Sequence, residues 1–160
     1  MNKIIEVLPD REALIKRSLD LIVEQIKTAI QERGLCSIAL SGGSTPQPLY
    51  EAIAAQDLDW EKIHVFWGDE RYVPPDDPDS NEGMARRAWL DRVSIPAANI
   101  HPMPTNEADP AVAASKHEEQ LRKFFNVPEG EFPALDIILL GMGDDGHSAI
   151  RWLEINPSRD

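Results

Sequence analysis

The stretch "LCSIALSGGSTP", residues 35–46, joins a short apolar run to a glycine-rich polar loop. Six apolar-rich residues are too few for a typical core helix, and a turn follows at once, so the pattern predicts a buried β-strand. The same pattern recurs in "IHVFWGDER", residues 63–71, and in "LDIILLGMGDDGH", residues 135–147. The predicted strands are therefore Leu35–Leu40, Ile63–Trp67 and Leu135–Leu140, each followed by a polar loop.

Helical patterns lie between these strands. Apolar residues recur at steps of three and four from Asp10 to about Arg33, which predicts an amphipathic helix that Gly34 ends. The sequence also predicts helices at 47–55, 80–93 and about 108–125, the last capped by Asp109 or a neighbour. A proline-rich acidic loop is predicted at 68–80 and a short strand at 99–101.

The alternation of strands and helices decides the fold class. Strands that are apolar on both faces are typical of parallel sheets covered by helices on either side. The 160 residues therefore predict one α/β domain, 1–160, a three-layer α/β/α sandwich with a mainly parallel sheet. In such sheets ligands bind beyond the carboxyl ends of the strands, so we expect the three polar loops to converge at one edge.

Composition narrows the class of partner. The formal net charge of −12 argues against nucleic acid and anionic membranes as partners, because both are bound through clustered Lys and Arg. A small anionic ligand remains compatible, provided that backbone N–H groups and a few arginines surround it. The sequence shows no signal peptide and no run of membrane-spanning length, and Cys36, the sole cysteine, lies in an apolar run. We therefore expect a cytoplasmic protein with a buried, inert thiol.

The loop at 41–46 has the features of a phosphate site. Gly42 and Gly43 permit unusual backbone conformations and the close approach of a ligand. Ser44 or Thr45 is suited to cap the following helix, with Pro46 in its first turn. Free N–H groups and the helix dipole would then attract an anion, although a plain strand-to-helix turn explains the glycines equally well. The loop lacks the lysine of a P-loop and the spacing of a dinucleotide fingerprint.

The loop after the second strand places three charged residues together, Asp69, Glu70 and Arg71. The Arg71 guanidinium is suited to face an anionic substrate and a developing oxyanion, while the alternative is a surface ion pair. Trp67, just before them, is expected in the core.

The third loop holds a histidine beside two carboxylates. A neutral His147 imidazole oriented by Asp144 or Asp145 is suited to take a proton from water, whereas an incidental histidine in a glycine-rich turn is the alternative. The other histidines, at 64, 101 and 117, are expected to be structural or superficial, with position 101 left open. No ligand spacing supports a metal site built from Asp69, Glu70, Asp144, Asp145 and His147, so we expect no metal there.

These motifs together resemble a known family. "LSGGSTP", "FWGDERYVPPDDPDSN", "IPAANIH" and "ILLGMGDDGHSA", in this order, are similar to the 6-phosphogluconolactonase family and its NagB/RpiA/CoA transferase-like fold. The stretch "WGDER" followed by "VP" and "SN" separates them from the related glucosamine-6-phosphate deaminases and isomerases. The resemblance implies hydrolysis of 6-phospho-D-glucono-1,5-lactone to 6-phosphogluconate, in the oxidative pentose phosphate pathway, without cofactor or metal.

The resemblance also implies roles for particular residues. His147 would activate water, Asp145 or Asp144 would hold its ring, and Arg71 or loop N–H groups would stabilise the oxyanion. The substrate and its 6-phosphate would be bound by a wider set, namely Ser41, Gly42, Gly43, Ser44, Thr45, Asp69, Gly143 and Asp144.

The chain departs from the family pattern after about Ala149. Residues 148–153 read "SAIRWL" where the pattern is roughly T-A-S-L-F-P, and the tail 150–160 is atypical. A truncated gene, a frameshift or a fragment would each explain this, and we expect little activity from the chain as given.

Two alternative functions stay open, a phosphosugar-binding remnant without catalysis and a sugar-phosphate isomerase or deaminase. A monomer is the default, with self-association through an exposed sheet edge.

Overall fold

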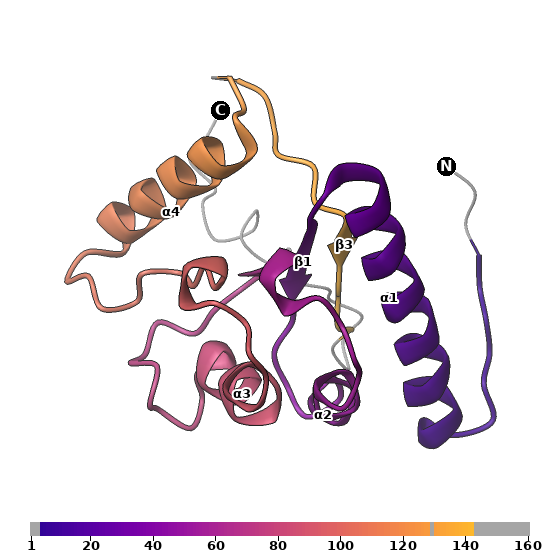
Figure 1. Ribbon diagram of the computed structural model, residues 1–160. Coiled ribbons are helices and arrows are strands. Elements are labelled where there is room, and N and C mark those ends of the chain that lie inside the picture. Colours follow the sequence, from indigo (N-terminus) through magenta and orange to yellow (C-terminus); the bar gives the residue numbers. More distant parts are fainter. Residues whose placement is uncertain (1–3, 129, 143–160) are drawn as a thin grey trace.

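The computed structural model describes residues 4–128 and 130–142 of the chain (Figure 1). Three parallel strands form one sheet in the order β2-β1-β3. The elements in chain order are α1 (Arg11–Arg33), β1 (Cys36–Leu40), α2 (Gln47–Ala54), β2 (Ile63–Trp67), α3 (Asn81–Ala88), α4 (Pro110–Phe125) and β3 (Ile137–Ile138), with single 3-10 turns at Trp60–Lys62, Leu90–Arg92 and Ala97–Asn99. The predicted α/β class with a parallel sheet is confirmed.

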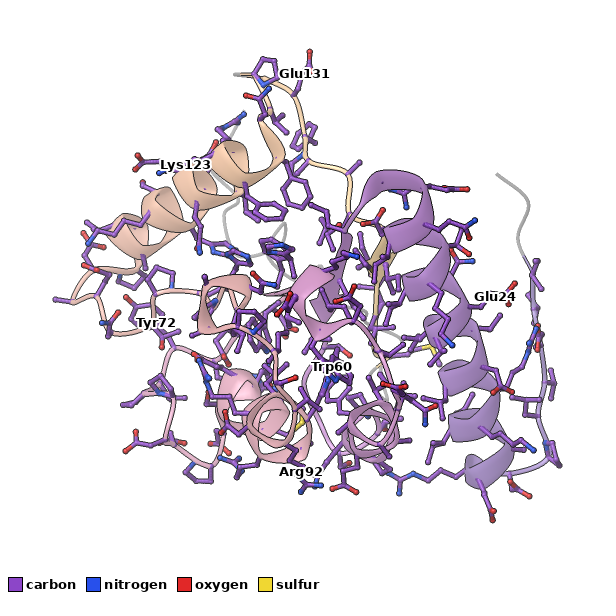
Figure 2. The ribbon with its side chains drawn as sticks, viewed as in Figure 1. Glu24, Trp60, Tyr72, Arg92, Lys123 and Glu131 are labelled. Atoms are coloured by element: carbon purple, nitrogen blue, oxygen red, sulfur yellow. The ribbon has the colours of Figure 1, made fainter. Side chains whose placement is uncertain are left out.

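Alternate residues of the central strands define the layers. Ile38 of β1 and Val65 of β2 are fully buried in one core with side chains of α1, α2 and α3. Phe66 points to the opposite face, where its ring lies 5.1 Å from that of Phe124 in α4. Helices therefore cover both faces, and α1 and α4 lie on opposite sides of β1 in Figure 1. The labelled side chains of Glu24 and Lys123 lie on the outer surfaces of these two helices (Figure 2).

Three helix boundaries follow from local capping chemistry. Asp10 accepts a hydrogen bond from the Ala13 N–H at 2.8 Å, and Gly34 ends α1 in a left-handed conformation with φ of 81°. Asp109 caps α4 in the same way, through the N–H of Ala111. The predicted starts and stops of these helices are confirmed, because caps depend on residues that are neighbours in sequence.

The predicted helix at 80–93 is too long. The α-helix ends at Ala88, since Trp89 leaves the helical region with φ of −139° and ψ of −65°. Its indole is fully buried and lies 6.1 Å from the rings of both Tyr50 and Trp60. Burial of this large ring turns the chain, which then makes only the 3-10 turn Leu90–Arg92.

The predicted strand at 99–101 is also wrong in extent. A 3-10 turn at Ala97–Asn99 occupies its start, and one parallel bridge joins Ile100 to Val65. The His101 N–H donates to the Val65 carbonyl at 2.8 Å, so the segment lies beside β2 for two residues.

The third strand differs most from its prediction. Regular pairing is confined to Ile137–Ile138, although backbone bonds to β1 continue on both sides, from Asp136 N–H and from Leu139 N–H. The Asp136 carboxylate itself accepts from the Ser37 N–H at 2.7 Å, which replaces part of the ladder by a side-chain bond. Ile138 and Leu140 are 55% and 57% exposed. The expectation that both faces of this strand are buried is therefore wrong for the described residues, because β3 lies at the edge of the described sheet and its outward residues lack a covering helix there.

Candidate active site

A cleft of about 1360 Å³ lies at the carboxyl edge of the sheet. The loops after all three strands contribute to it, through residues 41–46, 69–71 and 139–142, and α1 forms one flank. The parallel topology predicts this convergence, and the described parts of the loops show it. Four of the predicted site residues, Gly143, Asp144, Asp145 and His147, lie outside the described residues.

Tyr50 fixes the start of the first loop. Its ring is fully buried, and its hydroxyl donates to the Ser41 carbonyl at 2.7 Å and accepts from the Ser41 N–H at 3.0 Å. Burial raises the pKa of this phenol to about 12, so it stays a neutral donor and acceptor near pH 7. The backbone of Ser41 is therefore held at the edge of the cleft through both its N–H and its carbonyl.

Gly43 has a conformational reason to be glycine. Its φ of 96° lies in the left-handed region that other residues avoid, and a Cβ added there would meet no atom within 4 Å. The space beside it is therefore open, as a loop that receives a ligand requires.

The predicted cap of α2 is wrong. Pro46 occupies the cap position, without a side-chain bond from Ser44 or Thr45 to the helix. The Ser44 carbonyl instead accepts from Arg11 Nη2 at 2.8 Å. Arg11 begins α1 and also lines the cleft. Sequence reasoning missed it because an arginine in the first turn of a helix has no distinguishing neighbour pattern.

Glu70 is a structural anchor in this loop. Its carboxylate accepts from the N–H groups of Arg71, Asn81 and Glu82, each at 2.7 Å. Two of these groups belong to the first turn of α3, where an anion also meets the positive end of the helix dipole. Of the five residues weighed for a metal site, Glu70 thus has its oxygens bound to the backbone. Among the described residues, no group of three or more His, Cys, Asp or Glu side chains is arranged to hold a metal ion.

Arg71 lines the cleft with an exposed side chain. Within residues 4–128 and 130–142 it forms no ion pair with a carboxylate, so the surface-pair interpretation of this arginine finds no support there. Asp69 lines the cleft as well and is half-buried.

Asn81 joins the first two loops. Its amide donates to the Asp69 carbonyl at 3.1 Å, and a Cβ on Gly42 would lie 1.8 Å from its Oδ1. The close approach that Gly42 permits is therefore that of Asn81, which corrects the expectation that this glycine makes room for a ligand. Sequence reasoning quoted the Ser-Asn pair at 80–81 without assigning it a role.

The three described histidines lie away from the cleft. His64 and His101 face each other with Nδ1 and Nε2 3.1 Å apart, and α4 packs over them. Burial lowers the pKa of His64 and His117, and burial together with both neighbours lowers that of His101 to about 4. Their expected structural role agrees with these positions. Trp67 and Cys36 are buried as predicted, and burial raises the pKa of the Cys36 thiol to about 12.

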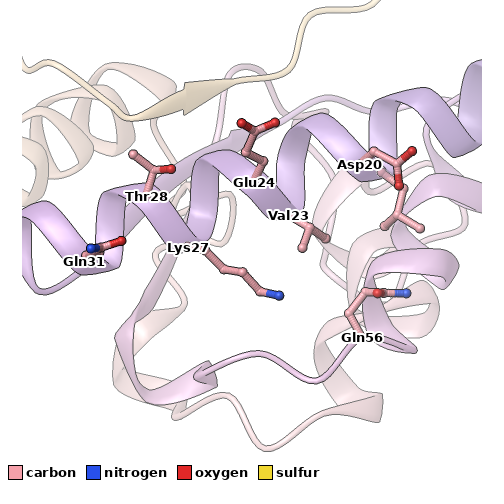
Figure 3. Close-up of a pocket in the computed structure, with 8 residues that line it drawn as sticks. Asp20, Val23, Glu24, Lys27, Thr28, Gln31 and Gln56 are labelled. Carbon is pink, nitrogen blue, oxygen red and sulfur yellow. The ribbon is translucent and has the colours of Figure 1, made fainter.

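A second, smaller hollow lies between α1 and the segment after α2 (Figure 3). Side chains of both charges line it, including Asp20, Glu24 and Lys27, together with Gln56 from the segment after α2. None of the predicted loop motifs contributes to it. The cleft at the sheet edge is therefore the candidate site.

The fold and this cleft define a class, that of three-layer α/β proteins with a polar site at the carboxyl edge of a parallel sheet. The family model for glucosamine-6-phosphate isomerases and 6-phosphogluconolactonases matches residues 9–150, and the chain belongs to this family.

Individual relatives agree with that assignment. A 6-phosphogluconolactonase of Nostoc is 68% identical over 149 residues, and one of Synechocystis is 61% identical over 145 residues. The alignments cover 93% and 91% of this chain but 62% and 60% of those relatives, so the chain spans about three fifths of their length. The crystal structure of 6-phosphogluconolactonase from Thermotoga maritima superimposes with a TM-score of 0.79 at 31% identity, covering 91% of this chain and 63% of that one. No helix in the described part of the chain is long and apolar enough to cross a membrane.

Proposed function

We propose that this chain carries a 6-phosphogluconolactonase site, which hydrolyses 6-phospho-D-glucono-1,5-lactone to 6-phospho-D-gluconate in the oxidative pentose phosphate pathway. The observation that carries the proposal is the convergence of the 41–46, 69–71 and 139–142 loops on one cleft. Relatives that are 68% and 61% identical to this chain are named for this activity. We further propose a cytoplasmic enzyme that uses neither metal nor cofactor.

The 6-phosphate is assigned to the loop Ser41–Thr45. Tyr50 holds the start of this loop, and the open space beside Gly43 admits an oxygen-rich group. Arg11 Nη2 is bonded to the Ser44 carbonyl, which places a guanidinium at the same end of the cleft. Binding energy from this remote anion would position the lactone carbonyl and lower the entropic barrier to its attack.

The chemistry is assigned to the other two loops. His147, oriented by Asp145 or Asp144, takes a proton from water as the water oxygen attacks the C1 carbonyl carbon. Negative charge grows on the carbonyl oxygen, where Arg71 or loop N–H groups stabilise it. The bond from C1 to the ring oxygen then breaks, the ring oxygen takes up a proton as a hydroxyl, and the new acid ionises. Asp69 and Gly143 are assigned to contacts with the sugar.

Proton release in a pH-stat with the freshly prepared lactone tests the proposal. His147→Ala removes the base, and we expect a rate about a hundred- to ten-thousand-fold lower, the range for a positioned acid–base group. His117→Ala, which changes a histidine away from the cleft, is the control and should retain the rate of the folded fraction. If the unaltered chain hydrolyses the lactone, an equal rate for His147→Ala would remove His147 from the mechanism.

Two further measurements separate the alternatives. Calorimetric binding of 6-phosphogluconate without any hydrolysis would identify a binding protein. Conversion between ketose and aldose phosphates, without lactone hydrolysis, would identify an isomerase on the same fold.

A further inference from the structure

Past the ends of β1 and β2, the two loops that enter the cleft are joined by a side chain of α3. The described backbone ladder between these strands reaches the Gly68 N–H, which donates to the Leu40 carbonyl at 2.9 Å. Beyond it, Asn81 lies between the two loops, with its amide on the Asp69 carbonyl and against the backbone of Gly42. Asn81, a residue that is only 4% exposed, therefore bridges the two loops.

The base from which Asn81 extends is held on several sides. Its own N–H and that of Glu82 donate to the Glu70 carboxylate, and the Ser80 hydroxyl accepts from the Gly83 N–H. A Cβ on Gly83 would lie 2.3 Å from the Pro75 carbonyl oxygen, so the first turn of α3 packs directly on the preceding loop. A side chain on such a base has little freedom to follow a loop that moves.

The Asn81 amide suits this position better than an aspartate carboxylate or a glutamine amide would. A carboxylate of the same shape would face the Asp69 carbonyl oxygen and add negative charge beside a site proposed for a phosphate. A longer amide has no room, because the atoms of Asn81 already lie against Gly42. Asn81 thus contributes both its N–H donor, to the Asp69 carbonyl, and its shape, against Gly42.

We propose that Asn81 is a positioning residue, which fixes the phosphate loop and the Asp69–Arg71 loop at the spacing that the phosphosugar requires. This inference rests on the proposed function, because the two loops are assigned to opposite ends of one substrate. A change in their spacing misaligns both ends together, and displacements of about 1 Å near a reacting centre lower rates by about a hundredfold. Asn81 would therefore affect affinity and turnover without touching the reacting atoms.

The test compares Asn81→Ala and Asn81→Asp with the unaltered chain, with calorimetric titration of 6-phosphogluconate and lactone hydrolysis as readouts. We expect at least a tenfold rise in Kd for each, and a fall in kcat wherever the unaltered chain turns over. Asn81→Asp keeps the shape of the side chain and remains informative if the alanine variant folds poorly.

A matched control is available in Asn99. This asparagine is also buried and donates its amide to a backbone carbonyl, that of Glu61, at 2.9 Å, away from the cleft. Asn99→Ala should lower the melting temperature but leave the Kd of the folded protein unchanged. A Kd for Asn81→Ala as little altered as that of Asn99→Ala would overturn the positioning role.

The steric part of the contact has its own readout. Gly42→Ala alone should disturb both affinity and stability, because its Cβ overlaps the Asn81 amide. The double variant Gly42→Ala/Asn81→Ala should recover part of both losses, and losses that simply add would contradict the contact. If the unaltered chain binds 6-phosphogluconate and the Asn81 variants bind it with the same Kd, the positioning role is wrong but the proposed function stands. An unaltered chain that neither binds 6-phosphogluconate nor hydrolyses the lactone defeats the proposed function and the positioning role with it, while the Gly42–Asn81 stability cycle still reports on the contact.

Discussion

At the scale of single residues, glycine serves three different purposes in this chain. Gly34 ends α1 in the left-handed region, and Gly43 occupies the same region within the phosphate loop. Gly42 has an ordinary φ but no room for a side chain, because Asn81 lies against it. The sequence alone shows three glycines next to turns. Backbone φ distinguishes Gly34 and Gly43 from Gly42. The constraint on Gly42 comes from Asn81, which is almost forty residues away in the sequence.

Gly43→Ala is the sharpest residue-scale test of the phosphate loop. An alanine at this φ is strained by about 1–2 kcal/mol, and relief of the strain would move the loop N–H groups. We expect the Kd of 6-phosphogluconate, measured by calorimetry, to rise by tenfold or more.

Gly34→Ala is the matched control for this variant. Its φ of 81° imposes a similar strain, its Cβ also meets no atom within 4 Å, and it lies at the far end of α1 from the cleft. It should lower the melting temperature to a similar extent and leave the Kd unchanged. Equal affinities for Gly43→Ala and Gly34→Ala would place the phosphate elsewhere.

At the scale of elements, local signals predicted most of the fold. The strand Ile63–Trp67 has its predicted bounds, α1 has its predicted stop and α4 its predicted cap, because these signals depend on residues that are neighbours in sequence. The errors arise where a distant residue decides. Trp89 ends α3 early as it enters the core, and beside β3 the Asp136 carboxylate takes a place in the ladder by accepting from the Ser37 N–H. The candidate site shows the same division.

Loop convergence at the cleft followed from parallel topology, which the sequence pattern contains. The contacts of Arg11 and Asn81 did not follow from it, because the partner of each side chain lies more than ten residues away in the sequence.

The attachment of α4 to the sheet gives an element-scale prediction for pH. His101 stacks on Phe66 with ring centroids 4.4 Å apart and faces His64, while the Gln120 amide of α4 lies 3.3 Å from its Nδ1. The pKa of His101 is lowered to about 4, whereas an unfolded histidine has a pKa of about 6.5. Between these values the unfolded chain binds a proton that the folded chain excludes. The free energy of unfolding should therefore fall as pH drops from about 6.5 to 4, and stay level, for this group, above that window.

Urea unfolding at a series of pH values measures this slope. His101→Phe keeps a ring against Phe66 and removes the titrating nitrogens, so its slope should be smaller by up to one proton. Carboxylates common to both chains contribute equally and cancel in the difference. Identical slopes in the two proteins would show that His101 does not resist protonation in the folded state.

At the scale of the whole molecule, charge and apolar surface act against each other. The net charge of −12 favours separate molecules. The cleft, however, has an apolar flank formed by α1, β3 and the segment after β3, on which large side chains are exposed: Leu14 at 45%, Leu21 at 39%, Ile138 at 55%, Leu140 at 57% and Met142 at 83%. These side chains all line the cleft, and exposed apolar surface of this kind favours association.

We therefore predict that the chain self-associates, and that salt strengthens the association by screening the repulsion between molecules. Sedimentation velocity over a concentration series should give a weight-average sedimentation coefficient that rises with protein concentration, more steeply in high salt than in low salt. Leu14→Gln/Leu21→Gln keeps residues that favour a helix and removes apolar surface from the flank, so it should reduce the rise. Val112→Gln on α4 removes a side chain of similar exposure, 42%, away from the cleft and should leave the rise unchanged. A sedimentation coefficient independent of concentration in both salts, or equal effects of the flank and α4 variants, would show that this apolar flank does not bind a second copy.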